Sequence, residues 1–317
     1  MYQDPARQRG RGPKIMLASL AAILALALTG CGLEPGADPG TRHALLNVTS
    51  GFGSKTLGTA VDDHVGGGLN DLAFTQRHFQ VSLLPGGHEV ATINGVGSHN
   101  FHVKWELYVN GTLSTKSPAR VGLHPGDHVW WDLQNWLVAQ PKAVVGAYPE
   151  PFTTGNGERE APTLLECGQS DIASCDLVGR ELRSEGLKPG IAELGGEQGP
   201  NSNCVLVGNW NEVRRAIISV LIEAGPAKSG VFGRFSGSDG FQLENPIGDL
   251  VGTLHGSIGL IAAVQNGTQT SPAWLITGTD AAGVRAAAEH LNSASLHNHF
   301  AVAIYRGRVI PLPVTGS

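Results

Sequence analysis

Charged residues, aromatic residues and cysteines are all scarce in this chain of 317 residues. Lysine, arginine, aspartate and glutamate make up 15% of it, aromatic residues make up 6%, and there are four cysteines. The formal net charge is −5 and no basic cluster follows the first few residues, so nucleic acid and anionic lipid are not expected as partners. With 41% hydrophobic residues, the chain can still bury a large core, which we expect to be divided between two domains.

Familiar catalytic and metal-binding motifs are absent as well. The sequence contains no glycine-rich dinucleotide fingerprint, no phosphate-loop lysine, no Gly-x-Ser-x-Gly elbow and no His-Glu-x-x-His helix. It also has no Cys-x-x-Cys pair of the kind that holds zinc. We therefore expect neither catalytic residues nor a metal site, and we do not expect an enzyme.

The N-terminus has the pattern of an export signal. Four basic residues precede an apolar run at residues 15–28, which is too short for a comfortable membrane span. The sequence Leu-Thr-Gly-Cys follows at once and resembles a bacterial lipobox, in which the thiol of Cys31 is lipidated. An ordinary signal peptide is the alternative. We predict a lipid anchor at Cys31, a tether over residues 31–42, and a location on the extracytoplasmic face of the cell membrane.

Three further cysteines lie in the second half of the chain. An exported compartment is oxidising, so one disulfide and one remaining thiol is the simplest arrangement. Cys167 and Cys175 are eight residues apart on either side of a polar loop, and we predict that they pair. The spacing leaves Cys204 open as an alternative partner.

Residues 43–156 carry the signals of a β-rich first domain. Short β-branched or aromatic runs, each bounded by Gly, Pro or Asn, predict strands. These runs occupy residues 44–52, 78–84, 88–96, 101–111, 128–136 and 142–149. Between residues 54 and 74 we expect at most a short helix, since glycines at 66–68 weaken it.

Three motifs within this domain stand in a recognisable order: "LLPGGHEVATINGVG", "WELYVNG" and "LHPGDHVWWD". They resemble the transcobalamin-like C-terminal domain family over about a hundred residues. The resemblance implies a small β-rich fold. In cobalamin carriers such a domain closes over a corrinoid held against a helical partner domain, and nothing in this chain looks like that partner. A cobalamin-type ligand is therefore what the resemblance suggests, and no other cofactor is expected. The matching positions are Gly86, Gly87, Ile93, Asn94, Gly95, Trp105, Tyr108, Val109, Asn110, Gly111, Gly126, Asp127, Trp130 and Trp131.

Strand alternation divides the tryptophan-rich run at residues 128–136 into two faces. Val129, Trp131 and Leu133 form an apolar face, which we assign to the core together with Trp105. His128, Trp130 and Asp132 lie on the opposite face. This face is partly exposed and a candidate for ligand contact, unless the second domain covers it.

Residues 160–317 change to strand–helix alternation, which predicts an α/β domain with a mixed sheet. Buried strands are expected near 162–168, 204–210, 257–266 and 273–280, a hairpin at 230–245, and closing strands at 300–307 and 308–313. Helices are expected at 174–185, 211–223 and 281–291. The fold class predicted for the whole chain is thus α+β or α/β, with a small β-rich domain before the α/β domain.

Three of these units repeat one pattern, in which an apolar strand, a glycine and small polar residues precede a helix. In open α/β sheets, ligands bind beyond the carboxyl ends of the strands. Helix N-capping is the alternative role for such side chains, above all for Asp280. The candidate ligand-binding residues from this pattern are Asn209, Asn211, Thr277, Thr279 and Asp280.

The sequence as a whole predicts an exported, lipid-anchored binding protein. It would capture a small molecule, or present it to a membrane transporter, with the ligand held between the domains. The alternative is a cell-envelope module that contacts another protein or a wall polymer and binds no small molecule.

Overall fold

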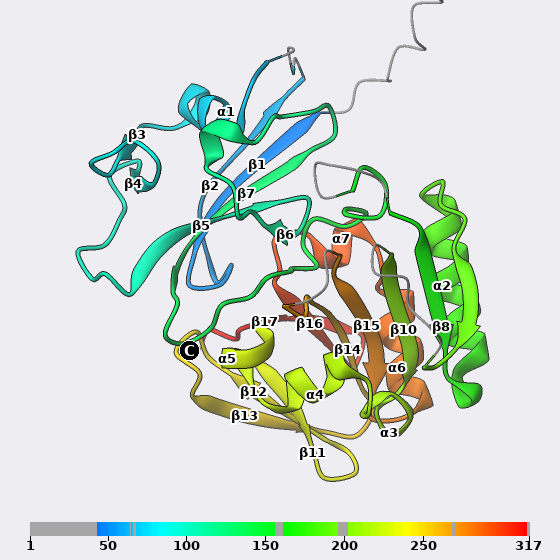
Figure 1. Ribbon diagram of the computed structural model, residues 1–317. Coiled ribbons are helices and arrows are strands. Elements are labelled where there is room, and N and C mark those ends of the chain that lie inside the picture. The colour runs from blue at the N-terminus through cyan, green and yellow to red at the C-terminus, as the bar shows by residue number, and fades with distance from the viewer. Residues whose placement is uncertain are drawn as a thin grey trace, which may run out of the picture. The chain divides into compact units, whose positions relative to one another are not determined.

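The computed structural model describes residues 43–63, 65, 68–155, 161–195, 202–267 and 271–315 (Figure 1). Contacts place these residues in one compact unit, within which each of the two predicted regions has sheets of its own. The export signal, Cys31 and the tether lie outside the described residues. None of the helices in the described part is long and apolar enough to cross a membrane.

The first region is built on a five-stranded sheet with the order β2-β1-β7-β5-β6. Strands β1 and β7 are parallel, and the other neighbours are antiparallel. A separate hairpin, β3–β4, and one helix, α1, accompany the sheet. The elements are β1 (Ala44–Ser50), β2 (Lys55–Asp62), α1 (Asp71–His78), β3 (Val81–Leu83), β4 (Val90–Ile93), β5 (Val103–Val109), β6 (Thr112–Leu113) and β7 (His128–Asn135).

Two expectations for this region are wrong. Residues 55–62 form strand β2, where the sequence suggested at most a helix, because they pair antiparallel with β1 at the edge of the sheet. Residues 142–149 form no strand. Their backbone instead follows a buried turn, with Val144 N–H donating to Gly111 and Val145 N–H to Phe300. The segment is apolar because it is enclosed, not because it belongs to a sheet.

The second region has a mixed seven-stranded sheet with the order β17-β16-β14-β15-β10-β8-β9. Strands β15, β10, β8 and β9 run parallel, and β14, β16 and β17 add antiparallel neighbours. This confirms the predicted fold class. The strands are β8 (Thr163–Cys167), β9 (Gly190–Glu193), β10 (Asn203–Asn209), β14 (Ile258–Val264), β15 (Ala273–Gly278), β16 (Ala301–Tyr305) and β17 (Arg308–Leu312).

Helices and a smaller sheet cover the two faces of the seven-stranded sheet. Helices α2 (Ile172–Ser184) and α6 (Ala281–Glu289) pack with the side chains of one face (Figure 1). The other face shares its core with α4 (Ile217–Glu223) and with the sheet β11 (Gly233–Ser236), β12 (Gly240–Glu244) and β13 (Leu250–His255). The single helix expected over 211–223 is two short helices, α3 (Trp210–Val213) and α4, because Ala216 takes an extended backbone conformation between them.

Strand β7 is buried on both of its faces. Val129 and Trp131 lie in a core with Phe74 of α1, and the Trp131 indole donates to Thr75 Oγ1 at 2.9 Å. Trp130 points to the other side, with its ring centroid 5.0 Å from that of Phe300. Trp130 is 1% exposed, so the expected partial exposure is wrong and the alternative of cover by the second region is correct.

A buried aspartate at the start of α1 makes the stability of the fold depend on pH. Asp71 is fully buried, and neither carboxylate oxygen has a hydrogen-bond partner in the described structure. Burial, and then the nearby Asp127, raise its pKa from 3.8 to about 8. The pKa of Asp71 is higher in the folded protein than in the unfolded chain. The stability that depends on protonated Asp71 is therefore fully present below pH 4 and is lost as the pH rises through 8.

We expect Asp71→Asn to remove this pH dependence. Between pH 5 and pH 9, the unfolding free energy of the wild-type protein should fall on the order of a few kcal/mol further than that of the variant. Urea unfolding at the two pH values measures the difference, with the exposed Asp249→Asn as the matched control. Parallel pH profiles for wild type and Asp71→Asn would contradict the assignment.

Candidate functional site

The polar face of β7, one of the two sites indicated by the sequence, does not reach solvent. His128, Trp130 and Asp132 are all nearly or fully buried. The His128 ring stacks on Trp130 and on His297, with centroids 6.0 Å apart in both cases, and bonds to Asn47. Burial, and then His297, lower the pKa of His128 to about 3, so the ring is neutral. These side chains join the two regions and leave no surface for a ligand.

Asp132 has a structural role that the sequence did not reveal. Its carboxylate accepts hydrogen bonds from Thr49 Oγ1 at 2.6 Å and from the backbone N–H groups of Phe52 and Gly53 at 2.9 Å each. It thereby fixes the turn between β1 and β2. Burial raises its pKa to about 6 against the opposing effect of these three bonds.

The second predicted site lies at the carboxyl ends of β8, β10 and β15, which share one edge of the sheet because the strands are parallel. Asn209 caps α3 and also donates to Asp171 Oδ2 at 3.2 Å. Asp280 caps α6 by accepting from Gly283 N–H at 2.8 Å, and it also accepts from Ser257. Thr279 Oγ1 accepts from the backbone N–H of Ile258, at the start of β14, and donates to the Gly256 carbonyl. Capping and turn formation thus account for these three side chains.

Of the remaining candidates from this pattern, Asn211 is exposed and Thr277 is fully buried. The structure brings Asn209 to the acidic pair of Asp171 and Glu212, and brings Asp280 to Ser257. The five predicted residues thus share a sheet edge, while the side chains of Asn209 and Asp280 bond to different neighbours.

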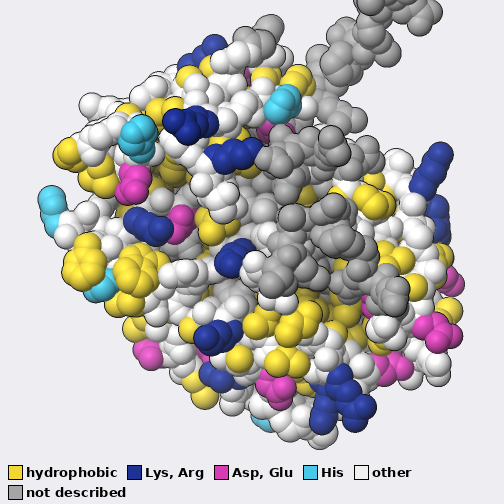
Figure 2. All heavy atoms as spheres, viewed as in Figure 1, with side chains coloured by type: hydrophobic (Ala, Val, Ile, Leu, Met, Phe, Trp, Pro, Cys, Tyr) yellow, Lys and Arg dark blue, Asp and Glu magenta, His cyan; other side chains and the backbone are white. Residues whose placement is uncertain are grey.

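An aromatic surface, formed by Phe101, His102, Trp136 and Leu137, lies where β5 begins and β7 ends. Phe101 is 79% exposed and Leu137 is 57% exposed. The Trp136 indole donates to the Phe101 carbonyl at 3.2 Å, and the His102 ring lies between the two aromatic side chains. Figure 2 shows hydrophobic side chains gathered over the connection between β4 and β5.

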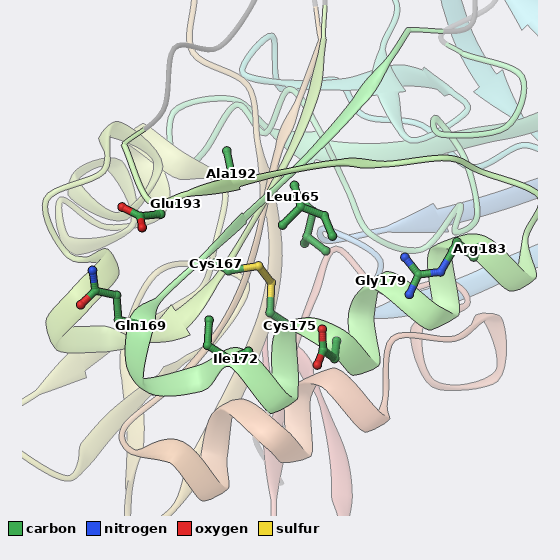
Figure 3. A pocket seen from close by; sticks show the side chains of 11 residues that line it. Leu165, Cys167, Gln169, Ile172, Cys175, Gly179, Arg183, Ala192 and Glu193 are labelled. Atoms are coloured by element: carbon green, nitrogen blue, oxygen red, sulfur yellow. A yellow bond between two sulfur atoms is a disulfide. The ribbon is translucent and has the colours of Figure 1, made fainter.

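A groove of about 300 Å³ lies beside the disulfide, which joins Cys167 at the end of β8 to Cys175 in α2 (Figure 3). This is the pairing that the spacing predicts, and Cys204 is buried outside it. Ile172 and Ile191 form exposed apolar walls of the groove, and Arg183 lies along α2.

A larger cleft of about 530 Å³ lies in the first region between β4 and β5. Its lining combines aromatic and aliphatic side chains with hydroxyl groups and charges of both signs. This mixture, and a volume within the usual range of about 300–1,000 Å³, are typical of small-molecule sites. The lining comprises Leu84, His88, Glu89, Val90, Ala91, Ser98, Val103, Lys104, Trp105, Glu106, Leu107, Leu113, Ser114, Thr115, Lys116, Ser117, Pro118, Trp131, Leu133, Gln140 and Lys142.

Trp105 is the unusual residue of this cleft. It is 7% exposed, as a core assignment requires, yet its indole N–H has no hydrogen-bond partner in the described structure. Trp130 and Trp131 both have a hydroxyl acceptor for the same group. A buried N–H left without an acceptor costs about 1–3 kcal/mol, and the fully buried Trp274 indole of the second region is unpaired in the same way.

Charged side chains surround the cleft without giving it one sign. Lys104 and Glu106 form an ion pair at 2.8 Å on β5, and Glu89, Lys116 and Lys142 contribute one charge each. No group of three or more His, Cys, Asp or Glu side chains in the described structure can hold a metal ion. The cleft is thus suited to binding a polar molecule with both acceptor groups and apolar groups.

Sequence reasoning missed this cleft because it placed Trp105 in the core by alternation. The available signal was the pair of opposite charges on either side of Trp105, Lys104 and Glu106, which marks a strand with one side open to water. Alternation shows which side chains are buried, and it does not show which strand edges remain unpaired.

Comparison with known families places the cleft in a recognised domain. Residues 73–135 match the family model described as a domain of unknown function, DUF4430. The match runs from within α1 to the end of β7, and it includes the whole cleft lining apart from Gln140 and Lys142. No curated protein matches the chain.

The unpaired indole can be tested by comparing two substitutions of the same size. Trp105→Phe removes an N–H that has no partner, whereas Trp131→Phe removes one that bonds to Thr75. We expect Trp131→Phe to lower the unfolding free energy by about 1–3 kcal/mol more than Trp105→Phe, since only the first loses a hydrogen bond and leaves a buried acceptor unpaired. Denaturant unfolding measures both. Equal losses would show that Trp105 has an acceptor within the chain.

Proposed function

We propose that the protein binds a small molecule in the cleft between β4 and β5, and holds it at the outer face of the cell membrane. The observation that carries the proposal is the Trp105 indole, buried in the cleft wall with no acceptor from the chain. A ligand acceptor at this position would satisfy it, and the cleft has the mixed polar and apolar lining of a ligand site.

The N-terminal sequence supports the proposed location. The basic residues, the short apolar run and the lipobox-like sequence before Cys31 are those of an exported lipoprotein. A binding protein attached in this way can present its ligand to a membrane transporter, which is the partner that we propose. The proposed function includes no catalytic step.

A corrinoid is the first ligand to test, because residues 44–152 resemble the transcobalamin-like C-terminal domain. The DUF4430 match covers the same three motifs, and its description names neither transcobalamin nor a ligand. A whole corrinoid is larger than the drug-sized molecules that fit a cleft of about 530 Å³, so it would extend beyond the cleft.

A second candidate function is a cell-envelope interaction module. The exposed aromatic surface of Phe101, His102, Trp136 and Leu137 favours it, since aromatic side chains are enriched where proteins contact partners. This function would use the aromatic surface and would not need the cleft.

The proposed function predicts that full-length protein purified from its own host retains a small ligand, visible as an added mass in native mass spectrometry. Trp105→Phe should weaken binding of that ligand, or of an added corrinoid, about tenfold, as expected for one lost hydrogen bond. Trp210→Phe, a substitution outside the cleft, is the matched control and should leave affinity unchanged. Equal affinity of wild type and Trp105→Phe would contradict the proposed site. A partner lost on Phe101→Ala, with no ligand retained, would favour the interaction module.

A further inference from the structure

One edge of β5 is unpaired along the cleft. Strand β7 pairs with β5 over residues 103–109, whereas β6 pairs only with residues 108 and 109 on the other side. Five consecutive residues of β5, from Val103 to Leu107, line the cleft. Side chains of a strand alternate between faces, so an uninterrupted run of lining residues means that the strand edge itself forms the wall.

The hydrogen-bond pattern identifies the free backbone groups on this edge. Trp136 N–H donates to the His102 carbonyl, so the even-numbered residues of β5 direct their peptide groups toward β7. The odd-numbered residues direct theirs to the cleft side. There Val103 N–H donates to Asn100, and the Leu107 carbonyl accepts from Ser114. Trp105 lies between the bonded groups of Val103 and Leu107. Its own N–H and carbonyl have no strand partner in the described structure.

Strand β4 bounds the opposite side of the same cleft. Glu89, Val90 and Ala91 line it as a second consecutive run, and β4 pairs with β3 on its far side. Figure 1 draws the β3–β4 hairpin apart from the five-stranded sheet that contains β5. An extended chain lying in the cleft would therefore run between the two, beside a strand with open backbone groups.

We propose that the ligand of this cleft is a short extended peptide, which adds as a strand to the free edge of β5. This inference rests on the proposed function and names the ligand class of the same site. The peptide would pair with the backbone N–H and carbonyl of Trp105, while one of its carbonyls accepts from the Trp105 indole. Five residues of β5 line the cleft, so a peptide of about four or five residues matches its length, at about 3.3 Å per residue.

The charges of the cleft suit the two ends of a free peptide. Lys142 lies in the lining and forms no ion pair with any residue that the structure describes, so it can receive the terminal carboxylate. Glu89 lies in the β4 wall and can receive the terminal ammonium group. Charges of both signs in a partly apolar cleft favour a zwitterionic peptide over a simple anion or cation.

The test begins with full-length protein and a pool of random pentapeptides with free termini. Native mass spectrometry identifies the peptides retained, and calorimetry gives their affinities. Each amide of the best peptide is then methylated in turn. Strand addition predicts at least a tenfold loss of affinity at alternate positions and little change at the positions between them, because only every second amide faces β5. The backbone amide of Trp105 should exchange with solvent at least tenfold more slowly in the complex.

Lys142→Ala separates recognition of the terminus from recognition of the backbone. This variant should bind the free-acid peptide about tenfold more weakly, and should bind the C-terminally amidated peptide as wild type does. Equal effects of methylation at every position, or no slowing at Trp105, would overturn strand addition. If no peptide binds while a corrinoid or another non-peptide ligand binds and is weakened by Trp105→Phe, the peptide inference fails and the proposed function stands. If Trp105→Phe alters the binding of no ligand, both fail.

Discussion

Strand β7 carries indole rings on both of its faces, and each ring is enclosed by a different hydrophobic core. Trp131 packs toward α1 within the first region, and Trp130 packs against Phe300 of the second. A strand in this position has no solvent face, so its polar side chains must find partners inside the protein. Asp132 does so through the β1–β2 turn and His128 through Asn47, while Gln134 pairs its amide nitrogen with Tyr108 and leaves its amide oxygen unpaired in the described structure. The turn geometry and the contact between the regions thus both follow from the burial of one strand.

The fold class and most elements could be predicted from periodicity and turn residues. Apolar runs such as 258–264 and 273–278 are strands because they are buried on both sides, and Asp280 begins a helix because its side chain caps Gly283. The turn Asn110-Gly111 follows from the positive φ angles that these residues tolerate. Strand β2 and the turn at residues 142–149 could not be predicted, because an exposed edge strand and an enclosed turn both depend on neighbours distant in the sequence.

The candidate sites, too, could be predicted from the sequence only in part. Small polar residues after strands were correctly located at one sheet edge, but capping already uses Asn209 and Asp280, so their position alone gives no ligand. The Trp130 face was correctly identified as unusual, yet its partner is the rest of the chain. The cleft at Trp105 depends on a strand that ends early, β6, and on a hairpin that does not continue the sheet. The charges of Lys104 and Glu106 show that β5 is open to water, but no local pattern shows that a neighbouring strand is missing along one edge.

The burial of β7 on both faces also limits whether the matched segment can be separated from the rest of the chain. The stretch that matches DUF4430 starts at residue 73 and ends at residue 135, whereas β7 has β1 as its parallel neighbour and Phe300 against its outer indole. A fragment cut at those limits would keep the cleft lining except for Gln140 and Lys142, would lose one strand adjoining β7, and would expose Trp130 to water. The boundaries of sequence similarity and the boundaries of cooperative folding are therefore different here. Any transfer of this cleft to another protein would have to carry β1 and a cover for Trp130 with it.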